Sequence, residues 1–147
     1  MSNVKPIPDG YHTITPYIIV DDVAKLIKFL EHAFDAKTIF AIQGPNGTIP
    51  HAELKIGNSM LMVGMAKAEH KAMPCALYVY FPDTDVTYKK ALKAGAESLM
   101  EPMDMFYGDR NAGVKDFAGN QWWIGTHIED VAPDELRKRA EEFYSKQ

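Results

Sequence analysis

Residues 116–124 read DFAGNQWWI, and they repeat in outline residues 54–62, which read LKIGNSMLM. Each stretch places a Gly-Asn pair between two runs typical of β-strands. The two pairs, Gly57-Asn58 and Gly119-Asn120, lie 62 positions apart. Gly and Asn accept the backbone conformations that tight hairpin turns need. The pattern therefore predicts two similar hairpins in one chain.

A second match lies upstream of each hairpin. Residues 18–22 (IIVDD) return as residues 79–83 (VYFPD), 61 positions later, and a helical stretch follows the acidic residues each time. Matching order and spacing over this length favours an internal duplication. The sequence thus predicts an α+β fold of two tandem βαβββ modules, with a ligand cleft on the concave surface between them. On the 62-residue spacing, Lys115 is the counterpart of Glu53, so the two linings are expected to differ.

The expected elements follow from apolar periodicity and turn residues. We expect strands at 13–20, 37–43, 49–56, 59–64, 75–81, 98–105, 110–116 and 121–126. Helices begin after residues 21–22 and 83–84, and Val86, Ala91 and Leu92 form the apolar side of the second. A last helix, about 132–145, begins near Pro133. One domain, residues 1–147, would hold module 1 (about 12–65), module 2 (about 75–128) and this helix.

Composition narrows the class of protein. Of the 147 residues, 46% are hydrophobic and 24% charged, and the net charge is −4. These values are ordinary for a globular protein and give no basic surface for nucleic acid or anionic membranes. The single Cys75 allows neither an intramolecular disulfide nor a cysteine metal cluster. No signal peptide or membrane-spanning run is seen, so we expect a cytoplasmic protein.

His51 and Glu53 lie two positions apart on a predicted strand, so their side chains share one face. Ala52 and Leu54 take the opposite face, where a helix would cover them. Such a polar face could line a cavity, bind a metal or supply an acid or base. It could equally be a solvated face whose two groups pair with each other.

Tyr107 and Arg110 precede the second hairpin. Arg110 could bind a carboxylate or phosphate through its planar guanidinium. It could instead hold the loop by pairing with Asp109, Asp116 or a backbone carbonyl.

Trp122 and Trp123 are adjacent on a strand, so they face opposite sides. One is expected under a helix and the other on a cavity wall or interface, where an aromatic surface suits flat or cationic ligands. The alternative is that both belong to the core.

Residues 107–124 resemble the glyoxalase/bleomycin-resistance/extradiol-dioxygenase group, the vicinal-oxygen-chelate (VOC) superfamily. Residues 51–58 are similar to its glyoxalase-like branch, as are residues 20–22 followed by a helix that contains Phe29. The resemblance covers roughly residues 12–128. It implies paired βαβββ modules, a cavity and usually a homodimer.

Enzymes of this group hold a divalent metal through His or Glu on the first and last strands of each module. The resemblance carries those positions to residues that are not usual ligands: Thr15, Leu61 or Met62, Ala76 and Trp123. We therefore expect no cofactor, and a binder or sequestering protein for a small organic ligand, with His51, Glu53, Tyr107, Arg110, Trp122 and Trp123 as ligand-binding residues.

Two other functions stay open. A metal-dependent glyoxalase, lyase or isomerase could use a shifted ligand set of His51, Glu53 and His127. An interaction module could keep the fold with a filled pocket.

Overall fold

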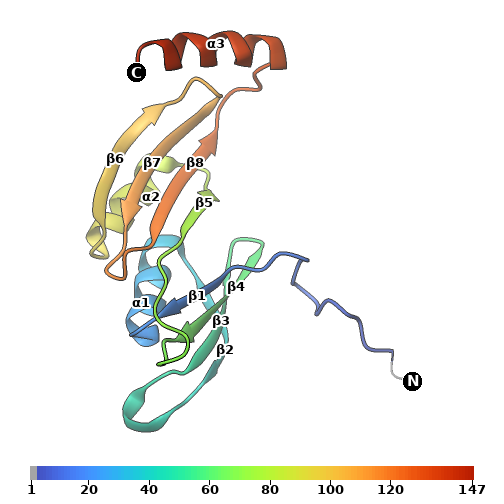
Figure 1. The fold of residues 1–147 in the computed structure, drawn as a ribbon, viewed down its shortest axis with the longest axis vertical. Coiled ribbons are helices and arrows are strands. Elements are labelled where there is room, and N and C mark those ends of the chain that lie inside the picture. The colour runs from blue at the N-terminus through green and yellow to red at the C-terminus, as the bar shows by residue number, and fades with distance from the viewer. Residues whose placement is uncertain (1–2) are drawn as a thin grey trace. The chain divides into compact units, whose positions relative to one another are not determined.

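The computed structural model describes residues 3–147 and confirms the α+β fold of tandem βαβββ modules (Figure 1). The chain divides into two compact units, each with one four-stranded sheet. The first contains residues 3–75 and 117–119, and the second contains residues 76–116 and 120–147.

The first unit follows the βαβββ order. Its elements are β1 (Tyr17–Val20), α1 (Val23–Phe34), β2 (Lys37–Ile42), β3 (His51–Ile56) and β4 (Ser59–Met65), with a short 3-10 turn (Pro45–Gly47). The sheet order is β1-β4-β3-β2, and β1 runs parallel to β4. The Asp22 carboxylate caps α1 by accepting a 3.0 Å hydrogen bond from the Lys25 backbone N–H. The apolar side of α1 is buried, together with Ala52, Leu54 and Val63 of the sheet.

The second unit repeats this order and adds a helix. Its elements are β5 (Ala76–Tyr80), α2 (Thr84–Lys93), β6 (Glu97–Asp104), β7 (Asp109–Lys115), β8 (Gln121–His127) and α3 (Pro133–Ser145). The sheet order is β5-β8-β7-β6. Asp83 caps α2 as Asp22 caps α1. The buried sheet residues on the α2 side are Ala112, Val114, Trp122 and Ile124.

The apolar side predicted for α2 is wrong at Val86, which is 53% exposed. The buried positions are Thr84, Thr87, Tyr88 and Ala91. Thr84 points at the sheet because its hydroxyl bonds the Arg110 carbonyl at 2.9 Å and the Thr126 hydroxyl at 2.8 Å. Val86 lies two positions, about 200°, further round the helix, so it faces solvent.

Strand pairing also corrects the counterpart of Glu53. Met62 pairs with Tyr17 as Trp123 pairs with Tyr78, so Met62 and Trp123 are counterparts. Met62 also pairs with Glu53, and Trp123 pairs with Gly113. The counterpart of Glu53 is therefore Gly113 and not Lys115.

A longer second turn causes this shift. Ile56 and Ser59 flank a two-residue turn, Gly57-Asn58. In the second hairpin the Asp116 N–H bonds the Asn120 carbonyl at 2.9 Å around residues 117–119. With one extra residue in the turn, β7 lies 60 positions after β3 while β8 lies 61 positions after β4, so neither strand follows the 62-residue spacing.

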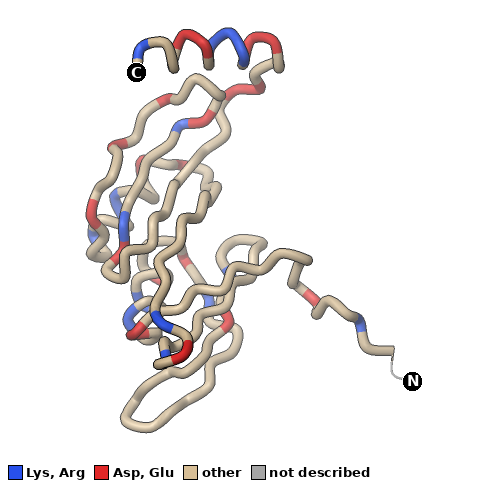
Figure 2. The backbone as a smooth tube through the Cα atoms, viewed as in Figure 1, with Lys and Arg blue, Asp and Glu red and all other residues tan. Residues whose placement is uncertain are grey.

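Helix α3 packs on the 105–108 loop of its own unit. The Phe106 and Phe143 rings lie 4.8 Å apart. Arg139 donates to both carboxylate oxygens of Glu129, at 2.7 and 2.9 Å, and to the Phe106 carbonyl. Acidic and basic segments follow one another along α3 (Figure 2). Among residues 3–147, no helix is long and apolar enough to span a membrane.

Candidate functional site

The sheet of the second unit has one face under α2 and one face turned away from it. Side chains alternate along a strand, so Trp122 and Ile124 lie under α2, while Trp123, Gly125 and His127 take the other face. Pairing adds residues from the neighbouring strands to this second face, which we call the open face. Its members include Tyr78, Tyr80, Asp109, Asn111, Gly113, Trp123, Gly125 and His127.

Two glycines let aromatic rings lie directly on the open face. A Cβ at Gly125 would lie 2.6 Å from atoms of the Tyr78 ring, and a Cβ at Gly113 would lie 2.4 Å from the Trp123 ring. Both distances are shorter than van der Waals contact. The absence of side chains at Gly113 and Gly125 is therefore what gives Tyr78 and Trp123 their positions.

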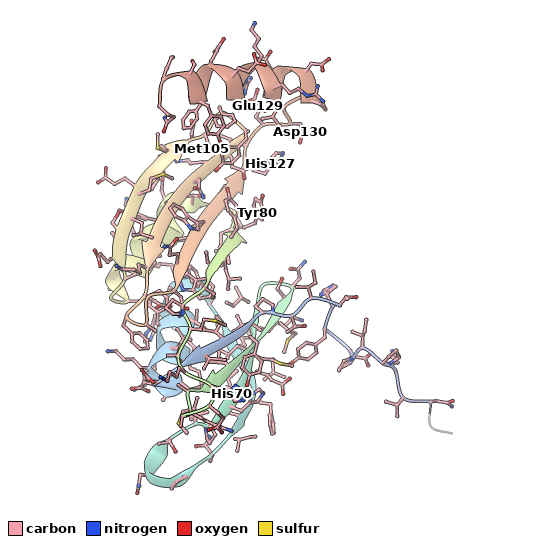
Figure 3. The ribbon with its side chains drawn as sticks, viewed as in Figure 1. His70, Tyr80, Met105, His127, Glu129 and Asp130 are labelled. Atoms are coloured by element: carbon pink, nitrogen blue, oxygen red, sulfur yellow. The ribbon has the colours of Figure 1, made fainter. Side chains whose placement is uncertain are left out.

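A buried carboxylate anchors one end of the open face. Asp109 is 5% exposed. Its Oδ2 accepts hydrogen bonds from the Tyr78 hydroxyl at 2.8 Å and the Tyr80 hydroxyl at 3.3 Å, and its Oδ1 lies 2.9 Å from His127 Nδ1. We call these four residues the Asp109 cluster. Figure 3 shows Tyr80 and His127 at the end of the sheet nearest α3.

The tyrosines of the cluster are neutral hydrogen-bond donors. Burial, followed by the hydrogen bonds to Asp109 and Tyr107, raises the pKa of Tyr78 far above its usual value of 10.0. Burial and the charge of Asp109 also raise the pKa of Tyr80. Tyr107, a predicted ligand-binding residue, thus lies beside this cluster.

His127 bridges two carboxylates. Its Nδ1 faces Asp109, and its Nε2 lies 2.7 Å from Asp130 Oδ1. The hydrogen bonds to Asp109 and then Asp130 raise the pKa of His127 above 6.5. The side chain of Asp130 is fully exposed, whereas that of Asp109 is 7% exposed. The imidazole therefore connects a buried acid to one in solvent.

His51 and Glu53 share the corresponding face of the first sheet, as the alternation predicts. The Tyr17 ring centroid lies 6.2 Å from that of His51, and Tyr17 covers Gly64 as Tyr78 covers Gly125. Glu53 accepts a hydrogen bond from the Tyr11 hydroxyl. Tyr11, in the segment that precedes β1, therefore occupies one oxygen of the Glu53 carboxylate.

Arg110 lies on the α2 side of its sheet and not on the open face. Its Nε is 3.1 and 3.2 Å from the two oxygens of Asp85, and its Nη1 is 3.0 Å from Asp104. Arg110 thus forms ion pairs, as one of the two interpretations expected, but with Asp85 and Asp104 and not with Asp109 or Asp116. A pocket of about 270 Å³ adjoins the guanidinium, lined by Asp85, Tyr88, Lys89, Glu101, Pro102 and Arg110.

Trp122 and Trp123 face opposite sides of the sheet, and only Trp122 belongs to the core, as one of the two interpretations expected. Trp122 is 0% exposed, and its indole N–H donates to Asp116 at 2.9 Å inside the turn. Trp123 is half-buried on the open face beside Tyr78. Only Trp123 of this pair is positioned to touch a ligand.

The residues present do not fit the metal centre that the family resemblance implies. Met62 and Trp123 stand at two of its positions, where their side chains pack beside Tyr17 and Tyr78. Across residues 3–147, no group of three or more His, Cys, Asp or Glu side chains could hold a metal ion. The nitrogens of His127 face carboxylates on opposite sides of the ring, so these three residues do not converge on one point.

Sequence reasoning missed Tyr78, Tyr80 and Asp109 as site residues. The duplication carried a usable signal, because Tyr78 and Gly125 each lie 61 positions after Tyr17 and Gly64. A tyrosine placed over a glycine in both copies shows that the two sheets pack this face in the same way. Nothing in the sequence indicated that the hydroxyls would reach Asp109 two strands away.

The model of the Glyoxalase/Bleomycin resistance protein/Dioxygenase superfamily matches residues 10–124. The chain belongs to this superfamily. An uncharacterized protein of Mycobacterium bovis is 30% identical to this VOC chain over 146 residues, covering 92% of each. An uncharacterized protein of Mycobacterium tuberculosis is also 30% identical, with 92% of this chain and 82% of the relative covered.

Solved structures share the VOC fold. TioX from Micromonospora sp. superposes with a TM-score of 0.68 at 22% identity, covering 80% of this chain and 99% of TioX. The fosfomycin resistance protein FosX from Listeria monocytogenes gives a TM-score of 0.59 at 15% identity, covering 85% and 97%. At these identities the similarity extends to the fold alone.

Proposed function

We propose that this VOC protein binds a small organic molecule on the open face of the second sheet, without the metal centre of the superfamily's enzymes. The observation that carries the proposal is the set of aromatic side chains on this face, Tyr78, Tyr80 and Trp123. Tyr78 and Tyr80 are 40% and 65% exposed. Exposed aromatic groups gathered on one face are typical of ligand or interaction surfaces.

Different residues of this face would make different kinds of contact with the ligand. Trp123 and Tyr78 rest on glycines and offer flat apolar surface for stacking. Tyr107, Tyr80 and His127 add polar groups at one end, where they would orient the ligand. Because the tyrosine hydroxyls are already bonded to Asp109, the rings are held in place before a ligand arrives, which lowers the entropy cost of binding.

The superfamily context supports sequestration as the biological role. The family name includes bleomycin resistance proteins, and FosX is described as a fosfomycin resistance protein. Both names describe resistance to a small molecule. We propose in addition that the protein is a cytoplasmic homodimer.

A ligand panel tests the proposal. Neutral aromatic, cationic aromatic and aliphatic compounds are titrated into the full chain, with binding followed by calorimetry and by the indole N–H resonance of Trp123. We expect at least one class to bind saturably and Trp123→Ala to abolish that binding. Tyr144→Ala is the matched control, because Tyr144 is equally aromatic and 65% exposed on α3.

Three results would count against the proposal. Binding that survives Trp123→Ala would place the ligand elsewhere. If no class of compound binds, the alternative of an interaction module with a filled pocket would be favoured. Stoichiometric metal in the purified protein, lost with His51→Ala or Glu53→Ala, would favour the metal-dependent enzyme instead.

A further inference from the structure

Two tyrosine rings and a buried carboxylate meet at one end of the open face. The Tyr78 and Tyr80 ring centroids are 5.0 Å apart, and the ring planes are inclined by 51°. Both hydroxyls bond Asp109 Oδ2. Since Tyr78 and Tyr80 remain 40% and 65% exposed, two inclined aromatic surfaces stay available to solvent while their hydroxyl ends are fixed.

The electrostatics of this end favour positive charge. The face of an aromatic ring carries partial negative charge, and a hydroxyl that donates to a carboxylate makes its ring more electron-rich. Asp109 and Asp130 are two carboxylates against the single imidazole of His127, so their sum is negative in either state of His127. Glu129 nearby is paired with Arg139 and adds little.

The geometry restricts which cation would fit. Asp109 already has three hydrogen-bond partners, and its side chain is 7% exposed. A ligand N–H therefore has no open path to this carboxylate, which would act on the ligand by its charge alone. A primary ammonium that lay against the two ring faces would lose hydrogen bonds to water that the rings do not replace. An alkylated ammonium has few such bonds to lose and can lie against the rings.

Building on the proposed function, we propose that the ligand class of this site is an organic cation with an alkylated, quaternary-type ammonium group. The ammonium sits against the faces of Tyr78 and Tyr80, and the rest of the molecule extends over Trp123. Trp123 is the neighbour of Tyr78 in the β5–β8 pairing, so the three rings line one continuous surface.

Choline and its neutral isostere 3,3-dimethylbutan-1-ol test the proposal, because they differ in charge and hardly in shape. Both are titrated into the isotopically labelled full chain, with the Gly125 amide and the Trp123 indole N–H as reporters. We expect choline to bind about 3- to 30-fold more tightly than the isostere, as a cation–π contribution predicts. Raised salt should weaken choline binding only.

Two variants localise the effect. Tyr80→Leu removes one of the two rings and should reduce the preference for choline over the isostere, while Tyr78 and the carboxylates keep part of it. Tyr80→Phe keeps the ring and loses the bond to Asp109, so most of the preference should remain. Tyr144→Leu on α3 is the control and should change nothing. The spectrum of each variant also reports whether the fold is intact.

The outcomes separate this inference from the proposed function. Equal affinity for choline and the isostere, or a preference that Tyr80→Leu leaves unchanged in size, overturns the cation proposal while small-molecule binding still stands. Failure of both probes overturns the cation proposal too. If the wider panel also fails to bind, the proposed function is lost with it.

Discussion

Tyr78 on β5 donates a 2.8 Å hydrogen bond to Asp109 on β7, across the strand β8 that lies between them. The reach is direct because β8 presents Gly125 beneath the ring. A side chain at this position would lift the ring and separate the hydroxyl from the carboxylate. The polar anchor of the open face thus depends on a residue that has no side chain.

Gly125→Ala should destabilise the protein by roughly 1–3 kcal/mol, the usual cost of overpacking. The new Cβ would lie 2.6 Å from the Tyr78 ring. Urea unfolding measures the change. The control is the same substitution in a Tyr78→Ala background, where the clash is removed and the cost should fall close to zero. Equal costs in both backgrounds would show that the ring does not constrain residue 125.

Trp122→Phe should cost about 1–3 kcal/mol, because the buried Asp116 carboxylate loses the indole N–H donor. Trp123→Phe should stay within about 0.5 kcal/mol, since Trp123 is half-buried and its N–H bonds only the exposed Gln121 side chain. Urea unfolding of the two variants gives the comparison. The reverse order of costs would contradict the assignment of Trp122 to the core.

His127 should titrate above 6.5, because protonation lets both ring nitrogens donate to carboxylates. A pKa raised by folding gives stability that is fully present below the unfolded-state pKa. That stability is lost as the pH rises through the folded-state pKa. NMR titration of the imidazole measures the shift, and unfolding at pH 5.5 and pH 8.5 measures the linked stability.

Asp130→Asn should lower the pKa of His127 toward its usual value. Asp134→Asn is the matched control, because Asp134 is equally exposed and pairs with Arg137 instead. An unchanged His127 pKa in Asp130→Asn would mean that Asp109 alone sets it. Asp109 and the Tyr78 and Tyr80 hydroxyls bonded to it are unaltered in this variant.

Arg139→Ala should loosen α3 and raise the pKa of Glu129, which the guanidinium holds below its usual value. Hydrogen exchange of the α3 amides should become faster, while the sheet of the second unit keeps its protection. Arg137→Ala removes only an exposed pair within the helix and serves as the control. Unchanged protection in Arg139→Ala would leave the Phe106–Phe143 contact as the sufficient anchor.

Local patterns in the sequence determine most of the fold. Asp22 and Asp83 predict the helix starts, and both carboxylates cap their helices. The first strand begins at Tyr17 and not at residue 13, because Pro16 precedes it and has no N–H for the sheet. The buried face of α2 was not predicted correctly, because it depends on hydrogen bonds between Thr84 and two residues far along the chain, Arg110 and Thr126.

The site was harder to predict because it depends on register. His51, Glu53 and Trp123 lie on the faces that alternation assigns to them. Arg110 and Trp122 point the other way, since a single residue of register exchanges the two faces of a strand. The Asp109 cluster joins three strands whose order in the sheet differs from their order in the chain. Residue spacing alone does not bring these together.

The tyrosine-over-glycine arrangement occurs at Tyr17 and Gly64 as well as at Tyr78 and Gly125. This contact constrains the order in which substitutions at the tyrosine and the glycine can accumulate in each module. A lineage that enlarges the glycine first passes through a clashing intermediate, whereas one that first shortens the tyrosine does not. We therefore expect descendants of this chain to change the tyrosine before the glycine, and variation at the two positions to be correlated within each module and independent between modules.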